Sequence, residues 1–323
     1  MQGKVSPAQD AQVRVYVGLD VCKAHLDVHL HPLGEQFRVA NTALGLRQLK
    51  RRLVRLAVDR VVLEATGKLH RLAHRHLHAE GFAVAVVNPL RARLFAEAKG
   101  WLAKTDRLDA RSLAILGEAM KPEARPPSAE EIEVLDELVR ARQQAVGEQT
   151  ALTNRMKASK GAFLLAEMKL RRAALREHIK RLQLEILRQI RQDQSLLRRY
   201  TILRSLRGVG PIAAATLLTA MSELGSCSAK AAALLAGLAP IARDSGQSFG
   251  QRHIRAGRAH VRAVLYMAAL TAITHNPPLA AFYKGLLARG KAHKVAITAV
   301  MRKIIVLANT LLRDNRLWST LSP

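Results

Sequence analysis

The chain of 323 residues carries 52 Lys and Arg against 25 Asp and Glu, a formal net charge of +27. Because 49% of its residues are hydrophobic, it is not a disordered polycation, and its length suits two or three domains. Such an excess of charge makes nucleic acid the first partner to consider. An aromatic content of 4% argues against a protein that works mainly by stacking single-stranded bases.

The cysteine content and the hydropathy indicate the cellular compartment of the protein. Cys22 and Cys227 lie far apart, which excludes a disulfide framework and fits a reducing, cytoplasmic location. We find no run of about 18 uncharged apolar residues, so no membrane span is expected. The longest apolar stretches that we identify, residues 211–221 and 263–274, are rich in alanine and predict buried helices.

Residues 13–125, after a flexible N-terminus at 1–12, predict an α/β domain. The first three predicted strands fit a meander, and the later strands alternate with helices, as in βαβ units on a mostly parallel sheet. Alternating or continuous apolar residues predict strands at 13–17, 25–30, 36–40, 60–64 and 82–87. Helical spacing predicts a helix opened by Thr42 and further helices at 69–79, 90–98 and 106–119.

Residues 126–200 predict a coiled coil or an antiparallel helical hairpin. Pro126 and Pro127 mark a linker, and Ser128 followed by Glu131 is a capping-box pattern. Helical spacing then continues to about Tyr200 without proline. Such a segment is either a solvated spacer or a dimerisation arm.

Residues 201–323 are rich in Ala, Gly and Arg and predict a mostly α-helical domain. They hold 16 Lys and Arg but only three acids, as expected of a surface that binds a polyanion. Gly208 and Gly210 precede an apolar helix and resemble a helix-hairpin-helix turn, whose backbone N–H groups would bind a phosphate. A plain connection between two helices is the alternative interpretation.

Four carboxylates are expected to converge in the N-terminal domain. Asp20 follows the first predicted strand, Glu64 ends the fourth, and Asp106 and Asp109 share one helical face. These two strands are plausible neighbours at the sheet centre, so their C-terminal ends coincide. Hard divalent cations prefer oxygen ligands, and two such ions promote phosphoryl transfer. Each acid alone is better explained as a surface ion pair, but the set of four is not.

Basic residues near these elements are candidates for nucleic-acid contact. Arg47, Lys50 and Arg51 lie on one helical face, which predicts either a nucleic-acid surface or a merely solvated face. Lys104 precedes the aspartate pair and Arg107 lies between its two members, and both are assigned to the same surface.

Both halves of the chain resemble the DEDD transposases of bacterial insertion sequences, which are related to the Piv/MooV pilin-gene invertases. In the first half the resemblance rests on GLDVCK at 18–23, LEATG at 63–67 and KTDRLDA at 104–110. In the second half it rests on GVG at 208–210, GLAP at 237–240, Ser245-Gly246 and IRAGR at 254–258.

The resemblance implies a fold and a mechanism. It implies an RNase H/RuvC-like domain whose carboxylates bind Mg²⁺ as a two-ion site, with Mn²⁺ as the alternative cation. It also implies a recombinase of double-stranded donor and target DNA, guided by a structured bridge RNA and assembled as a homodimer or tetramer. Ser245 is the implied nucleophile, which would form a phosphoserine link, and Ser248 is the alternative. Phosphate contacts are expected from Arg243, Arg252, Arg255, Arg258 and Arg262.

Two other functions stay open on the residues alone. A metal-dependent Holliday-junction endonuclease needs the same carboxylates, but its nucleophile is water and it forms no covalent adduct. A non-catalytic protein that packages nucleic acid explains the charge but not the four placed acids.

Overall fold

The computed structural model describes residues 13–65, 67–101, 106–242, 244, 250 and 252–319, with the side chains of residues 106 and 107 outside this description. The chain divides into two compact units, Met1–Ser128 and Ala129–Pro323. Each unit has its own hydrophobic core. The first unit is mixed α/β and the second is mostly α-helical, as the sequence patterns predict.

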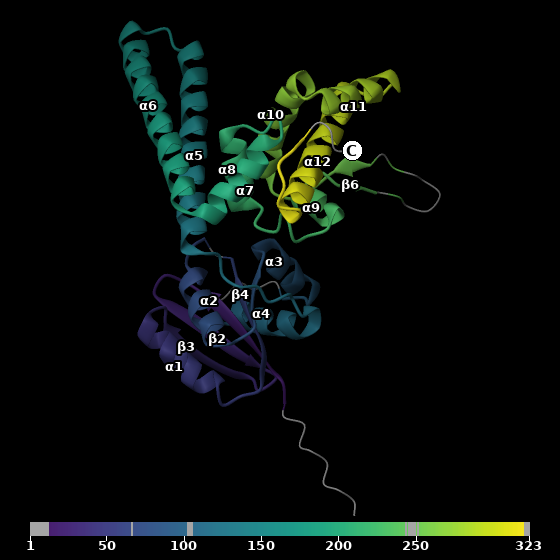
Figure 1. Ribbon diagram of the computed structural model, residues 1–323. Helices are drawn as coiled ribbons and strands as arrows, with labels where there is room; N and C mark the ends of the chain where they lie inside the picture. Colours follow the sequence, from purple (N-terminus) through teal and green to yellow (C-terminus); the bar gives the residue numbers. More distant parts are fainter. Residues whose placement is uncertain are drawn as a thin grey trace, which may run out of the picture. The chain divides into compact units, whose positions relative to one another are not determined.

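The first unit is built on a mixed sheet with strand order β3-β2-β1-β4-β5 (Figure 1). β1, β2 and β3 form an antiparallel meander, whereas β1, β4 and β5 are parallel. The predicted topology is therefore confirmed, and β1 lies at the centre of the sheet beside β4. The strands are β1 (Val15–Val21), β2 (His25–His31), β3 (Glu35–Ala40), β4 (Val58–Glu64) and β5 (Val84–Val87).

Helices cover both faces of this sheet. α1 and α2 bury Leu49 and Leu77 against apolar side chains of β1, β2 and β4. On the opposite face α4 packs Leu113 against Val62, together with residues of α3. The helices are α1 (Ala43–Leu53), α2 (His70–Ala79), α3 (Pro89–Ala98) and α4 (Asp106–Met120).

Glycines allow α4 to lie unusually close to the sheet. A Cβ atom on Gly18 of β1 would lie 1.9 Å from the Ala110 carbonyl oxygen and 2.5 Å from the Ala114 backbone nitrogen. One on Gly117 of α4 would lie 2.9 Å from Val62 Cγ2. Backbone therefore packs on backbone where α4 crosses β1, which fixes the position of the first turns of α4.

Local sequence signals define most of the helix starts. Thr42 caps α1 by accepting a hydrogen bond from the Gly45 backbone N–H at 3.3 Å, as predicted. The predicted capping box at Ser128 is wrong, because the helix begins at Glu130 after Ala129 and no side chain caps it. The acids of that first turn still favour the start through the helix dipole.

The second unit begins with a helical hairpin of α5 (Glu130–Ala158) and α6 (Ala162–Gln192) (Figure 1). Leu135 and Val139 of α5 and Ile186 and Ile190 of α6 belong to the core of the whole unit. The base of the hairpin is therefore anchored in the helices that follow it in the chain.

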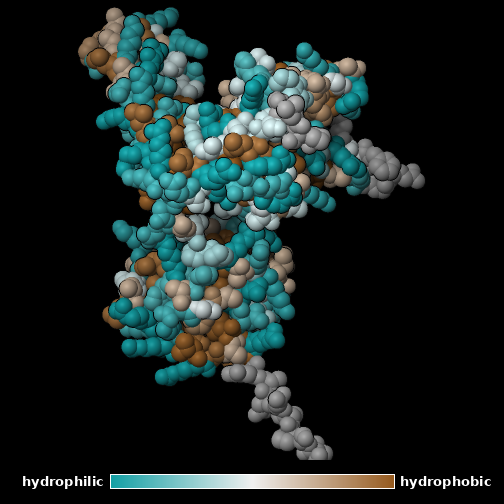
Figure 2. Space-filling model, in the orientation of Figure 1, coloured by the Kyte–Doolittle hydropathy of each residue, from teal (hydrophilic) through white to brown (hydrophobic). Residues whose placement is uncertain are grey.

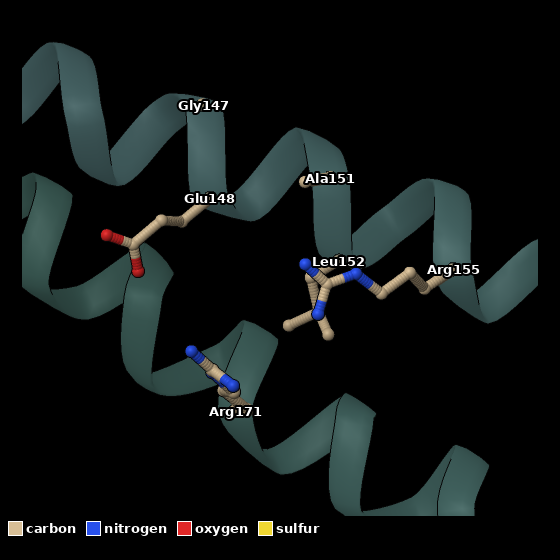
Figure 3. A pocket seen from close by; sticks show the side chains of 6 residues that line it. All are labelled: Gly147, Glu148, Ala151, Leu152, Arg155 and Arg171. Atoms are coloured by element: carbon tan, nitrogen blue, oxygen red, sulfur yellow. The ribbon is translucent and has the colours of Figure 1, made fainter.

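Farther along the hairpin, small residues leave the two helices less tightly packed. A hollow of about 300 Å³ lies beside Gly147 and Ala151 of α5. Figure 3 shows Arg155 of α5 and Arg171 of α6 beside this hollow, near Glu148. The packing of the hairpin therefore weakens away from its base.

The rest of the second unit is a helical cluster with a two-stranded hairpin of β6 (Pro240–Ile241) and β7 (His253–Ile254). Its large apolar core joins residues of all its helices, and α9 contributes the small Ala232. The helices are α7 (Gln194–Ser205), α8 (Pro211–Ala220), α9 (Ala229–Leu235), α10 (Ala259–His275), α11 (Pro277–Ala288) and α12 (His293–Arg313).

By length and composition alone, α12 could cross a membrane, although no membrane span was predicted from the sequence. It carries Arg302 and Lys303 at its middle. Its apolar face, including Ile297, Val300 and Ile304, is buried in the core of the second unit. This burial explains its hydropathy as that of a core helix.

Replacing Gly18 with alanine tests the close approach of α4. The added methyl group would overlap the α4 backbone, so we expect Gly18→Ala to lower the free energy of unfolding by at least about 2 kcal/mol. Urea unfolding would be followed by Trp101 fluorescence in a Trp318→Phe background. Trp101 suits this purpose because Arg111 of α4 lies 5.4 Å from the centre of its ring.

The control is Gly147→Ala, where an added Cβ would meet no atom within 4 Å. That change should leave the Trp101 transition unaltered, because Gly147 belongs to the other unit. A Gly18→Ala protein as stable as the parent would show that the α4 backbone does not depend on this contact.

Candidate active site

The sheet brings two predicted site residues to one edge. Asp20 lies inside β1, one residue before its end, and not after the strand as predicted, because β1 continues to pair with β2 as far as Val21. Glu64 is the last residue of β4, whose parallel pairing with β1 aligns Leu63 with Leu19. Asp20 and Glu64 therefore directly follow this aligned pair and lie at the C-terminal ends of adjacent parallel strands.

Both side chains share the sheet face that α4 covers. Successive residues of a strand alternate between faces, so Asp20 shares a face with Gly18, and Glu64 with Val62. Gly18 and Val62 both meet α4. Asp20 and Glu64 are half-buried, as expected at the rim of a covered face.

α4 supplies the remaining two carboxylates. The helix begins at Asp106, whose side chain lies outside the described residues, and Asp109 follows in its first turn. Asp109 is half-buried and directly precedes Ala110, whose carbonyl faces Gly18. Because Gly18 is two residues from Asp20, the start of α4 lies over the same edge of the sheet.

This edge of the sheet suits a hard divalent cation, because Asp20, Glu64 and Asp109 all offer carboxylate oxygens as ligands. Within the described side chains no three His, Cys, Asp or Glu groups are already arranged as a metal site. The side chain of Asp106, the fourth expected ligand, lies outside the described residues. The strands and the helix thus supply the carboxylates of a candidate metal site.

A fifth carboxylate, Asp27, was missed by sequence reasoning. In the antiparallel pairing of β1 with β2, Asp27 lies directly opposite Asp20. It is 6% exposed, and Arg38 of β3 donates to both of its oxygens, from Nε at 3.0 Å and Nη2 at 2.9 Å. The alternation of polar residues along β2 was visible in the sequence, but the partner that neutralises Asp27 was not.

The same face of β2 continues with two histidines. His31 Nε2 lies 3.0 Å from Glu118 Oε2 of α4. His29 is buried beside Gln36, and burial, with the charges of Arg111 and His31, lowers its pKa. His29 is therefore neutral at neutral pH and adds no charge to the site.

The candidate nucleophile lies outside the described residues. Ser245, Ser248 and Arg243 fall between β6 and β7 in the sequence, and all three are excluded. The two strands pair antiparallel, Pro240 with Ile254. The ends of this connection are thus held next to each other.

Two family-like motifs pack tightly next to these strands. A Cβ atom on Gly257 would lie 2.2 Å from the Gly237 backbone nitrogen, and both glycines have positive φ angles, +69° and +68°. Only residues without a Cβ fit this contact, so the motifs at 237–240 and 254–258 form one structural element.

Two of the expected phosphate-binding arginines are used within the fold. Arg258 pairs with Glu223 through two hydrogen bonds of 2.6 and 2.8 Å. Arg262 donates to the Ala256 carbonyl at 2.7 Å. Arg258 and Arg262 therefore have structural roles, and their contact with phosphate stays a prediction, whereas Arg252 and Arg255 are exposed.

The turn at 206–210 packs against α10. Gly208 has a φ of +111°, and an added Cβ would lie 2.6 Å from Ala272 Cβ of α10. Asn276 donates to the Arg207 carbonyl at 3.1 Å. Gly208 thus serves helix packing, whereas Gly210, at the start of α8, faces open space.

On α1, Arg47 and Arg51 are exposed, as expected of a nucleic-acid surface. Lys50 is instead half-buried and forms an ion pair with Glu80. Lys104 and the Arg107 side chain lie outside the described residues.

Comparison with known proteins identifies the family. A transposase model for DEDD enzymes matches residues 17–159, and a model of the IS116/IS110/IS902 transposase family matches residues 200–284. The pilin gene-inverting protein of Moraxella bovis is 28% identical over 94% of this chain and 97% of its own length. The chain belongs to the IS110 transposase family.

Two further relatives support the same family assignment. The pilin gene-inverting protein of Moraxella lacunata is 27% identical over the same shares of both chains. A protein of insertion element IS116 from Streptomyces clavuligerus is 33% identical over 46% of this chain and 37% of its own length.

The IS110-family assignment decides the class of activity. The protein is a DNA recombinase of the transposase type, and DNA is its substrate. A non-catalytic packaging role is therefore wrong. For a DEDD transposase, dependence on a divalent metal ion is the corresponding expectation.

The Arg258–Glu223 pair yields a stability prediction. The Glu223 side chain is 13% exposed, so Glu223→Gln removes a partly buried charge-assisted pair. We expect the free energy of unfolding of the second unit to fall by about 1–3 kcal/mol. Trp318 fluorescence in a Trp101→Phe background reports this unit.

The matched control is Glu177→Gln on α6. Glu177 and its partner Lys180 are both more than 60% exposed and 3.7 Å apart, so the change should cost less than about 0.5 kcal/mol. Equal effects of the two variants would contradict a structural role for the Arg258–Glu223 pair.

Proposed function

We propose that this protein is a metal-dependent, bridge-RNA-guided recombinase that cuts and rejoins DNA through a phosphoserine intermediate. The observation that carries the proposal is the convergence of Asp20, Glu64 and the start of α4 at one edge of the sheet. This edge belongs to an RNase H/RuvC-like domain, in the interpretation that we favour.

Asp20, Glu64, Asp106 and Asp109 would hold two Mg²⁺ ions, with Mn²⁺ as the alternative. When bound, the ions would activate the attacking oxygen and stabilise the leaving oxygen of a phosphoryl transfer. The chain itself contributes rigid placement, because three of these residues follow or lie on elements whose backbones pack directly together. Such preorganisation lowers the cost of bringing like charges together.

Ser245 is the proposed nucleophile. Its Oγ forms a bond to a DNA phosphorus while the bond from that phosphorus to a deoxyribose oxygen breaks. The serine proton leaves to a base, and the released sugar oxygen takes up a proton. Rejoining reverses these events with a different strand end, so no external energy source is needed.

In this proposal the active site is composite, with carboxylates and serine supplied by different subunits of a homodimer or tetramer. The tip of the α5–α6 hairpin supports self-association. Figure 2 shows hydrophobic side chains gathered there, and Phe163 and Leu170 are 81% and 67% exposed. Exposed large apolar groups of this kind are typical of association surfaces.

Recognition of the target is assigned to a structured bridge RNA. The exposed basic residues Arg47, Arg51, Arg252 and Arg255 carry no base-reading pattern and suit phosphate contacts with RNA and DNA. A low aromatic content fits a protein that leaves sequence reading to base pairing. In this proposal the recombinase acts in the cytoplasm.

A trapping experiment tests the nucleophile. The protein would be incubated with Mg²⁺, end-labelled DNA carrying the ends of the element, and RNA transcribed from the flanking segment. A denaturing gel should reveal a covalent protein–DNA adduct, which Ser245→Ala abolishes and the neighbouring Ser248→Ala retains. Asp20→Asn should lower adduct formation by about 10²-fold or more, the scale for losing electrostatic stabilisation of a transition state.

Each other outcome has a meaning. Recombination and adduct formation by Ser245→Ala would exclude this serine. Mg²⁺-dependent cleavage by the parent protein without any adduct would favour hydrolysis of the Holliday-junction endonuclease type. Full recombination after omission of the RNA would contradict RNA guidance.

A further inference from the structure

We propose that Arg38 binds a phosphate of the DNA strand that enters the carboxylate site, and that Asp27 holds Arg38 in place for this purpose. The inference rests on the proposed function, because it assumes that DNA is cut at the edge marked by Asp20 and Glu64. It adds a binding residue on β3, a strand that none of the motifs above includes.

The sheet places Arg38 in line with the carboxylates. Asp20 of β1 pairs with Asp27 of β2, and Asp27 pairs with Arg38 of β3. Directly paired residues project from the same face, and their Cβ atoms lie about 4.5–5.5 Å apart. Two acids and one guanidinium therefore form a row across three strands, on the face that α4 covers.

Asp27 fixes the orientation of Arg38. Arg38 donates both hydrogen bonds, from Nε and Nη2, so the Asp27 carboxylate binds one edge of the planar guanidinium. The Arg38 side chain is 53% exposed, whereas that of Asp27 is 9% exposed. A buried acid thus anchors a cation that reaches the surface.

A hollow beside Arg38 extends to the helix that carries Asp109. It has a volume of about 360 Å³, and the residues lining it include Asp27, Gln36, Arg38 and Ala110. Ala110 directly follows Asp109 on α4. The hollow therefore joins the Arg38 guanidinium to the first turn of α4, where the carboxylates converge.

The charge of this row also calls for a cation. Carboxylates at a DNA-cutting site repel phosphate, and the second acid of the row increases that repulsion unless it is neutralised. Arg38 neutralises Asp27 and, by its fixed fork of donors, suits a phosphate oxygen. Next to it, a second hollow is lined by Arg38, Arg51 and Arg52, so the basic surface continues from the site onto α1.

Binding with Ca²⁺ in place of Mg²⁺ provides a test that does not depend on catalysis, because carboxylate oxygens bind both cations and the acids stay neutralised. The affinity for a short DNA duplex would be measured by fluorescence anisotropy at several salt concentrations. Loss of one phosphate contact should reduce the log–log salt slope by about 0.9. We expect this reduction for Arg38→Ala and not for the control Arg14→Ala. Arg14 is an exposed arginine that pairs with Asp59 and directly precedes β1, at the end of the strand opposite to Asp20.

A double variant separates phosphate binding from simple neutralisation of Asp27. Asp27→Asn/Arg38→Gln retains two polar side chains that hydrogen-bond each other but removes both charges. It should unfold like the parent protein, yet its single-turnover strand cleavage at subsaturating DNA should fall about 10- to 100-fold, the range for one charge-assisted contact. The Mg²⁺ concentration for half-maximal rate should stay unchanged, and guanidinium ion should partly restore Arg38→Ala.

The contradicting results are distinct from failure of the proposed function. Parent-like cleavage and salt slope in the double variant would overturn the inference and leave Arg38 as a neutralising partner only. A shifted Mg²⁺ requirement would instead assign Arg38 and Asp27 to the metal site. Asp20→Asn is measured alongside: if it cleaves normally, the carboxylate site itself is wrong, whatever Arg38 does.

Discussion

The candidate active site depends on one contact, that between Gly18 of β1 and the backbone of α4. No side chain intervenes, because a single methyl group at Gly18 would overlap the Ala110 carbonyl. Helix and strand are therefore locked at backbone distance two residues from Asp20 and one residue from Asp109. Parallel pairing of β1 with β4 then adds Glu64 at the same edge. Acids remote in sequence thus become neighbours through backbone packing, whose position is insensitive to side-chain rotamers.

Charge is distributed around this edge in a way that suits a DNA recombinase. The acids stand against a formal excess of 27 positive charges, much of it in the second unit. Not all of those charges face a substrate. Arg258 and Arg262 are used to fix the tight packing around Gly237, whereas Arg252 and Arg255 stay exposed on the same segment. The basic composition therefore serves both folding and binding, and only the structure separates the two uses.

Sequence patterns were sufficient for elements whose signals are local. Alternation and helical spacing predicted the meander of the first three strands and the neighbours β1 and β4, and Thr42 marked a helix start correctly. Local signals failed where tertiary contacts decide. Ser128 has the pattern of a cap but lies outside the helix, and the packing of Gly208 against α10 could not be predicted from its motif.

The largest omission at the candidate site has the same cause. Asp27 is one of several polar residues on β2, and nothing near it in the sequence distinguishes it from its neighbours. Its significance comes from cross-strand register, with Asp20 on one side and Arg38 on the other. Strand and helix patterns supplied the four carboxylates, and family resemblance supplied Ser245, but a residue that acts through register becomes visible only when the strands are paired.

Anomalous X-ray scattering from crystals grown with Mn²⁺ tests the central claim most directly. The account predicts Mn²⁺ peaks at the C-terminal edge of β1 and β4, within about 2–2.6 Å of carboxylate oxygens from Asp20, Glu64 and the first turn of α4, the range for hard cations. Asp20→Asn should weaken or remove those peaks. Mn²⁺ bound elsewhere, with this edge empty at saturating metal, would contradict the claim that these carboxylates form the catalytic metal site.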